Sequence, residues 1–171
     1  MYKQSLAAAA LAASLAFGSA ATHAATPAPA PSIVDVASSV CEQTGEFCIL
    51  VAAVQAADPA VAARLSSRGQ VTVFAPTNQA FLDLLAELGV EGLDDIDQAT
   101  LTQVLLYHVV PGRRTSTSVL PSTRLRTLQG GFLRQAGGVL TDNRDRQAAI
   151  VGVDNLASNG VIHVINRVVL P

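Results

Sequence analysis

Cys41 and Cys48 are the only cysteines in the chain, and their chemistry depends on whether they can reach each other. Residues seven apart on an unbroken helix are separated by about 10.5 Å along its axis. A disulfide needs Cα atoms within about 7 Å, so pairing requires a turn between two helices, which Gly45 can supply. A metal or redox pair is disfavoured, because the spacing is not C-x-x-C and no histidine lies nearby. The pattern predicts a structural disulfide.

The imidazoles beyond the first 24 residues are those of His108 and His163. Together with Asp154 they could ligate a metal, but their spacing matches no ligand pattern. The segment 142–145 hints at a calcium loop, yet Arg144 stands where an oxygen ligand belongs, so a polar hairpin turn is predicted. G-x-S-x-G, H-E-x-x-H, Walker and G-x-G-x-x-G motifs are all missing from the sequence. We expect no enzyme activity, no cofactor and no metal.

The amino-terminal residues have the layout of a secretory signal peptide. Lys3 is followed by an uncharged, Ala/Leu-rich stretch over residues 6–17, and small residues then allow cleavage after Ala20 or Ala24. Twelve residues span about 18 Å as a helix, short of the ~30 Å hydrocarbon core of a bilayer. We therefore expect residues 1–24 to be removed and no membrane span to remain.

The segment after the leader, residues 25–31, alternates alanine and threonine with proline and predicts an extended spacer. The folded domain is expected over residues 32–171, which is long enough for one hydrophobic core. Export places the protein in the periplasm or outside the cell, where disulfides persist.

Charge is sparse and segregated. The chain is 50% hydrophobic and 14% charged, with a net charge of −2, which argues against a nucleic-acid binder that works by bulk charge. Residues 32–97 carry two arginines against ten acidic residues, a net charge of −8, and residues 98–171 carry eight arginines against three, a net charge of +5. The charges could be ordinary solvated faces, or they could drive weak self-association or capture of an anionic surface polymer. The acidic group is Glu87, Glu91, Asp94, Asp95 and Asp97, and the basic group is Arg113, Arg114, Arg124, Arg126, Arg134, Arg144 and Arg146.

Hydrophobic periodicity predicts helices in the first half of the domain. Apolar residues recur at helical spacing from Phe47 to Val54. Asp58, either Thr77 or Asn78, and Asp97 are typical caps for helices that reach Leu65, Leu88 and Leu106.

A strand-rich pattern follows, after a short apolar run at 71–74 in the helical half. Tyr107 and His108 are expected in an apolar strand, and 161–165 in a central strand buried on both sides. The prediction is an α+β fold with a β-sandwich or barrel-like core. The later runs lie around Leu125, Phe132–Leu133, Val139–Leu140, Ile150–Val153, Val161–Ile165 and Val168–Leu170, punctuated by Gly130-Gly131, Gly137-Gly138 and Asn159-Gly160.

Three segments together resemble a known family: residues 72–81 (TVFAPTNQAF), 105–112 (LLYHVVPG) and 159–171 (NGVIHVINRVVLP). They are similar to the first, central and last motifs of the fasciclin domain, in the same order. The resemblance implies an N-terminal helical layer packed on a β-sandwich wedge. It also implies a non-catalytic role in adhesion, with a cell-surface or matrix protein or polysaccharide as partner and no nucleic acid.

The resemblance also implies site residues. In animal relatives, partner contact is associated with the Tyr-His block, which here is Leu105, Leu106, Tyr107, His108, Val109 and Val110. Thr77 and Asn78 are expected as structural residues at a helix start, and His163 as a hydrogen-bonded core histidine. The alternative function is a carrier that holds an apolar small molecule, a lipid or pigment, between helices and sandwich.

Overall fold

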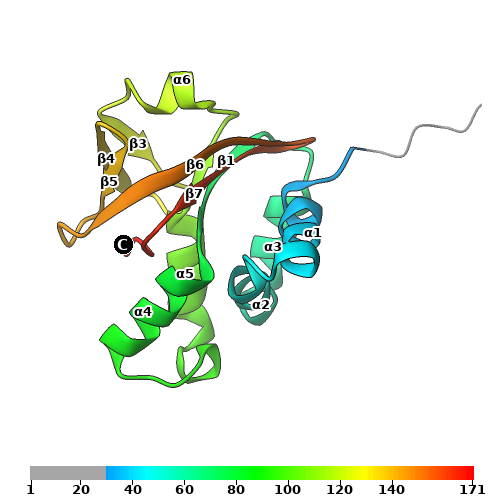
Figure 1. Cartoon of the computed structure of the whole chain (residues 1–171), viewed down its shortest axis with the longest axis vertical. Coiled ribbons are helices and arrows are strands. Elements are labelled where there is room, and N and C mark those ends of the chain that lie inside the picture. The colour runs from blue at the N-terminus through cyan, green and yellow to red at the C-terminus, as the bar shows by residue number, and fades with distance from the viewer. Residues whose placement is uncertain (1–29) are drawn as a thin grey trace, which may run out of the picture.

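The computed structural model describes residues 30–171. The predicted signal peptide and most of the predicted spacer lie outside the described residues. In Figure 1 the helices α1–α5 lie on one side of the long strands β6 and β7, and the short helix α6 lies on the other. No helix within residues 30–171 combines the length and apolar character needed to cross a membrane.

The helices begin where the sequence offers capping side chains. Asp58 accepts a hydrogen bond from the backbone of Ala60 (2.8 Å), Thr77 from Ala80 (3.3 Å) and Asp97 from Thr100 (2.9 Å). Each side-chain oxygen satisfies an amide that has no partner inside its helix. The three predicted caps are confirmed, with Thr77 rather than Asn78 in the cap position. The helices are α1 Ile33–Thr44, α2 Cys48–Ala56, α3 Pro59–Ser66, α4 Asn78–Leu88, α5 Gln98–Tyr107 and α6 Ser116–Val119, with a 3-10 turn η1 Leu93–Asp95.

Seven strands form one mixed sheet with the order β2-β1-β7-β6-β5-β4-β3. The pairing of β1 with β7 is parallel and every other pairing is antiparallel. The strand β7 lies between β1 and β6 and is almost wholly buried, which confirms the prediction for residues 161–165. The strands are β1 Val71–Pro76, β2 Val109–Pro111, β3 Arg124–Arg126, β4 Phe132–Ala136, β5 Val139–Thr141, β6 Gln147–Ala157 and β7 Gly160–Ile165.

The predicted sandwich is one sheet folded on itself. The strand β6 pairs with β5 at one end and β7 at the other, and register shifts between Ile150 and Asn155 bend it. One hydrophobic cluster joins Phe74 of β1 to Leu133 of β4, so the two halves of the sheet face each other. A second cluster packs the other face of β1 and β7 against helices α1–α5. Two cores therefore share the central strands.

The segment Val168–Leu170 is not a strand, and that prediction is wrong. The three residues are buried, but they form no ladder with a neighbouring strand. The amide of Val169 donates to the His108 side chain (3.1 Å) and that of Leu170 to the Asp142 side chain (2.9 Å). Buried backbone amides need partners, and here polar side chains replace the neighbouring strand.

The turn between β6 and β7 links the start of α1 to the end of α3. The buried Asn159 side chain accepts from the amide of Ile33 (2.9 Å) and donates to the carbonyls of Leu65 (2.6 Å) and Ser67 (2.8 Å). The next residue, Gly160, pairs with Val71 across the parallel ladder. A Cβ at position 160 would lie 2.0 Å from the Val71 carbonyl oxygen. Glycine is therefore required here for close approach of two backbones.

Gly160→Ala should destabilise the domain by about 3 kcal/mol or more, because the backbone of β1 must move to admit the methyl group. Gly92→Ala is the matched control, since its Cβ would meet its nearest neighbour at 4.0 Å, and its effect should stay within about 0.5 kcal/mol. Urea unfolding of both variants measures the difference. Equal free energies of unfolding for the two variants would show that the close approach at Gly160 does not contribute to stability.

Candidate functional site

The Tyr-His block lies at the junction of a helix and a strand. Tyr107 is the last residue of α5, His108 is its C-cap, and β2 begins at Val109. The expectation that Tyr107 and His108 sit in a strand is therefore wrong. The helix beginning at Asp97 continues one residue past Leu106, because Tyr107 fits the helical register of buried positions.

Most of the block is core. Leu105, Tyr107, His108, Val109 and Val110 are at most 4% exposed. The remaining member, Leu106, is partly buried. The Tyr107 hydroxyl donates to the carbonyl of Phe132 (2.7 Å), and burial raises the pKa of that phenol. In the folded domain the block thus supports packing, and its role as a contact site for a partner stays a prediction.

His108 connects α5 to the end of the chain. Its Nε2 accepts from the amide of Val169, so the neutral ring carries its proton on Nδ1 and donates to the carbonyl of Val104 (2.7 Å). Both ring nitrogens are then satisfied. Burial lowers the pKa of His108 to about 4, although the Val104 carbonyl and the negative charge of Asp142 act in the opposite direction.

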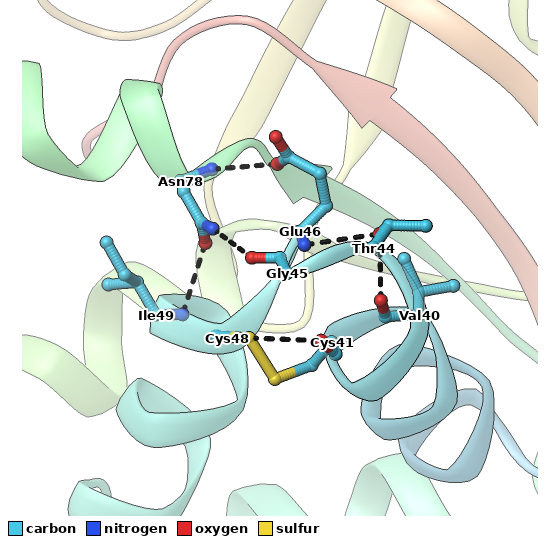
Figure 2. Close-up of a disulfide and its surroundings, with 8 residues drawn as sticks. All are labelled: Val40, Cys41, Thr44, Gly45, Glu46, Cys48, Ile49 and Asn78. Carbon is cyan, nitrogen blue, oxygen red and sulfur yellow. Dashed lines mark hydrogen bonds between the residues drawn. A yellow bond between two sulfur atoms is a disulfide. The ribbon is translucent and has the colours of Figure 1, made fainter.

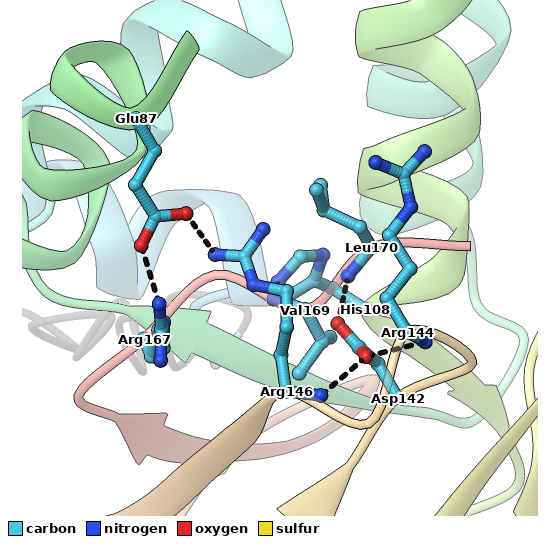
Figure 3. Close-up of polar contacts among 8 residues, drawn as sticks. All are labelled: Glu87, His108, Asp142, Arg144, Arg146, Arg167, Val169 and Leu170. Carbon is cyan, nitrogen blue, oxygen red and sulfur yellow. Dashed lines mark hydrogen bonds and ion pairs between the residues drawn. The ribbon is translucent and has the colours of Figure 1, made fainter.

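Asp142 is a buried carboxylate whose structural role the sequence reading missed (Figure 3). It accepts from the amides of Arg144 (2.8 Å), Arg146 (3.0 Å) and Leu170 (2.9 Å). An aspartate that begins a polar turn can predict the first two bonds, because such side chains bond amides two or more residues ahead. The third bond joins residues 28 apart in the chain, and no local pattern indicates it. The predicted hairpin turn at 142–145 is confirmed.

The arginines of the predicted basic group do not form one surface, because one of them is ion-paired within the fold. Glu87 of α4 forms ion pairs with both Arg146 (2.9 Å) and Arg167 (Figure 3). The Arg146 side chain is only 15% exposed, so its charge is used within the fold. One member of the predicted acidic group and one of the predicted basic group therefore neutralise each other across the domain.

Asn78 clamps the disulfide turn to α4 (Figure 2). Cys41 and Cys48 are bonded, and Gly45 adopts a left-handed conformation (φ 76°) that ends α1 between them. The Asn78 side chain donates to the carbonyl of Gly45 and accepts from the amide of Ile49 (3.2 Å). The disulfide and the turn at Gly45 appear as predicted, and Asn78 braces that turn.

His163, Asp154 and Ser116 lie together without the geometry of a catalytic triad. The His163 Nδ1 accepts from the amide of Asp154 (3.3 Å), and its Nε2 donates to the carbonyl of Arg114 (2.9 Å). The Ser116 hydroxyl donates to the Asp154 carboxylate instead of the imidazole. A nucleophile needs a free base within hydrogen-bond reach, and the ring of His163 is fully used by backbone groups. Within residues 30–171, no three histidine, cysteine or acidic side chains are placed to hold a metal ion.

An apolar groove lies between α4, η1, α5 and the last residues. Its volume is about 330 Å³, at the lower end of the range for small-molecule sites, roughly 300–1,000 Å³. Arg144 contributes a cationic side chain to the lining. The apolar lining includes Phe81, Leu84, Leu88, Leu93, Ile96 and Leu170. The groove therefore offers a concave, mainly apolar lining to a ligand.

A second exposed feature is an apolar row on β6. Val151 is 59% exposed, Val153 47% and Leu156 59%. The strand β5 pairs with β6 through residues 147–149, so beyond Ile150 the described pairing of β6 is with β7 alone. Apolar side chains therefore reach solvent along the stretch of β6 that β5 does not pair with. We call Val151, Val153 and Leu156 the β6 row.

Comparison with known proteins identifies the class. The fasciclin domain family model matches residues 45–171, and the chain belongs to this family. It is 42% identical over 144 residues to protein sll1483 of Synechocystis sp., covering 83% of this chain and 74% of the relative. It is 35% identical over 127 residues to transforming growth factor-beta-induced protein ig-h3 of Sus scrofa, covering 73% of this chain but 18% of that protein.

A solved structure supports the fold. A FAS1 domain pair from the insect cell adhesion molecule fasciclin I superposes with a TM-score of 0.54 at 20% identity, over 69% of this chain and 43% of the other. Identity at this level is informative about the fold alone. The predicted α+β fasciclin-like architecture, a helical layer on a folded β-sheet, is confirmed.

His108 should make the domain sensitive to mild acid. The pKa is lower in the folded state (about 4) than the ordinary value of 6.5, so the unfolded chain binds the proton first as the pH falls. The contribution of neutral His108 to the free energy of unfolding is fully present above about pH 6.5. It is lost as the pH falls toward 4, and the loss is about 3 kcal/mol. Urea unfolding at a series of pH values should show a flatter profile for His108→Gln, which cannot titrate. An unchanged slope in that variant would contradict the assignment.

Proposed function

We propose that the protein is an exported, non-catalytic interaction module that mediates cell-surface or matrix adhesion through weak protein or polysaccharide contacts. The observation that carries the proposal is the β6 row. Large apolar side chains that are about half exposed, on a stretch of strand that pairs with one neighbour only, are features of protein contact sites. Family membership supports the same role, since fasciclin I is named as a cell adhesion molecule.

The proposed contacts are individually weak. Three aliphatic side chains form a small patch, and interfaces of limited area belong to transient complexes. Adhesion can still be strong when many copies act together on one surface, because linked contacts multiply. Export rests on the predicted signal peptide at residues 1–24, and the destination is the periplasm or the extracellular space.

Replacing the β6 row should weaken attachment. A strain that lacks the gene can be complemented with wild-type protein, with Val151→Ser plus Leu156→Ser, or with the control Leu82→Ser plus Leu120→Ser. The control residues are 50% and 45% exposed but lie on α4 and just after α6. Surface attachment and aggregation should fall at least two-fold for the β6 variant and stay at the wild-type level for the control. Unchanged attachment after deletion of the gene itself would overturn the adhesion proposal.

A second candidate function is the carriage of an apolar small molecule, a lipid or pigment, and the groove between α4 and α5 favours it. Protein purified from its native host should then contain a stoichiometric ligand detectable by absorbance or by mass spectrometry after solvent extraction. Ala99→Phe should abolish that ligand, because Ala99 lines the groove and the larger side chain would fill it. A wild-type protein that carries no extractable molecule would remove this candidate.

A further inference from the structure

The hairpin of β3 and β4 has one face that the fold does not use. Leu125 and Leu133 point into the core and are at most 1% exposed. Side chains alternate between the two faces of a strand, so Arg124, Arg126 and Arg134 lie on the opposite, solvent-exposed face. The half-buried Phe132 shares that face. We call these four residues the arginine face.

The strand register brings the positive charges close together. Arg124 pairs directly with Arg134, and Arg126 pairs with Phe132. Like charges opposite each other in a sheet destabilise it. The exposed pair of Arg134 with Asp145 (3.3 Å; side chains 69% and 84% exposed) compensates little, because such ion pairs contribute at most about 1 kcal/mol. Repulsion between the arginines therefore disfavours the arrangement in the isolated domain, and an anionic partner would relieve that repulsion.

One guanidinium of the face is already held in place. The Arg124 side chain lies over the Phe132 ring, 3.7 Å from its centroid. This cation–π contact restrains the arginine and leaves its N–H donors directed at solvent. A guanidinium restrained in this way loses less entropy when it binds a carboxylate or sulfate.

The other arginines of the basic group differ. Arg146 pairs with Glu87 in the fold, and Arg113 lies within 3.4 Å of the carbonyl of Ala157. Arg126 has no side-chain hydrogen bond or ion pair among the described residues. Arg114 and Arg144 likewise have no side-chain hydrogen bond or ion pair among the described residues, but they lie outside β3 and β4. The β3–β4 hairpin is distinct because three arginines share one of its exposed faces.

We propose that the arginine face binds a linear acidic polysaccharide, whose repeated carboxylates or sulfates contact Arg124, Arg126 and Arg134 in turn. This inference rests on the proposed adhesion function and names the partner class for it. Arginine forms bidentate hydrogen bonds with such anions. Arg124 and Arg126 lie two residues apart on β3, and Arg134 lies opposite Arg124 on β4. Sheet strands lie about 4.8 Å apart, so the three charges form a flat, closely spaced cluster that suits an extended chain better than a pocket ligand.

The surroundings favour a slender partner over a broad one. The amino-terminal half of the domain has a net charge of −8, and a broad anion such as a membrane or a DNA duplex is repelled wherever it also faces that half. Screening limits such repulsion to roughly 8–10 Å in physiological salt, so a single polysaccharide strand on the hairpin avoids it. Phe132 lies beneath Arg124 and is not free to enter a bilayer or stack on a base.

A second copy of the chain is the less favourable occupant. Two carboxylates of its acidic group are already engaged: Asp95 accepts from the amide of Gly92 (3.2 Å), and Asp97 from that of Thr100 (2.9 Å). Hydrogen bonds from Thr100 lower the pKa of Asp97. Acceptors used inside the fold have fewer lone pairs left for arginines of another molecule.

The test is equilibrium binding of purified domain to immobilised alginate, a polyuronate, and to dextran sulfate, with neutral dextran as a blank. Binding to at least one polyanion and not to dextran is expected. Neutralising three charges should make affinity fall roughly twenty- to forty-fold between about 50 mM and 200 mM NaCl. The triple variant R124Q/R126Q/R134Q should lose at least ten-fold in affinity at low salt.

The control R64Q/R68Q/R113Q removes the same charge elsewhere and should change affinity less than three-fold. Arg126→Gln alone should weaken binding measurably, and it keeps the test valid if the triple variant does not fold. The proposal is overturned if the control and the triple variant lose the same affinity for the polyanion. It is also overturned if the domain binds anionic vesicles or duplex DNA more tightly than the polysaccharides. Sedimentation that shows oligomers formed through the arginine face would overturn it as well. If the polyanion-binding test fails while attachment still depends on the β6 row, the polysaccharide is ruled out as the partner and the adhesion function remains supported.

Discussion

The parallel pairing of β1 with β7 determines how the rest of the domain is arranged. It joins residues about 90 positions apart, and such pairing is unfavourable until the intervening chain has been ordered. The turn at Asn159–Gly160 compensates, because the buried amide satisfies three backbone groups of α1 and of the α3 end, and glycine lets β7 approach the carbonyl of Val71. With β7 fixed between β1 and β6, one face of the central strands is available to the helices and the other to the folded half of the sheet.

The polar residues of the fasciclin motifs serve this architecture. Asn78 braces the disulfide turn, His108 holds Val169, and His163 bonds the backbone of Asp154 and Arg114. A buried polar group left without a partner costs about 1–3 kcal/mol, so each of these side chains stabilises the fold by being satisfied. A side chain whose donors and acceptors are used by the backbone has little left for a ligand. Interaction in this domain is therefore a property of its surface.

Local signals explain which parts of the structure the sequence predicted. Helix caps such as Asp58 and the turn at Gly45 depend on residues within one helical turn, and the central strand at 161–165 is recognisable from its continuous apolar run. The irregular course of Val168–Leu170 has no local signal, because the backbone partners of Val169 and Leu170 come from distant segments. Tyr107 belongs to a helix because it continues the register of buried positions in α5, which the apolar run around it conceals. The bond from the Leu170 amide to Asp142 is non-local in the same way. The sequence groups seven arginines into one basic surface, but strand register determines which of them lie side by side.

The distribution of charge has a physical consequence for how such a domain can adhere. Glu87 of α4 forms ion pairs with Arg146 and Arg167. Some of the opposite charges of the two halves of the sequence therefore pair with each other and link α4 to the segments that flank β6 and β7. Three of the other arginines share one face of the β3–β4 hairpin, and β5 separates β4 from β6 in the sheet order. Apolar contact at the β6 row is insensitive to salt, whereas attraction at the arginine face weakens as salt rises. In the proposed function, two surfaces with opposite physical character would let one small domain join a protein contact to a polyanion contact, and neither needs to be strong when both are engaged.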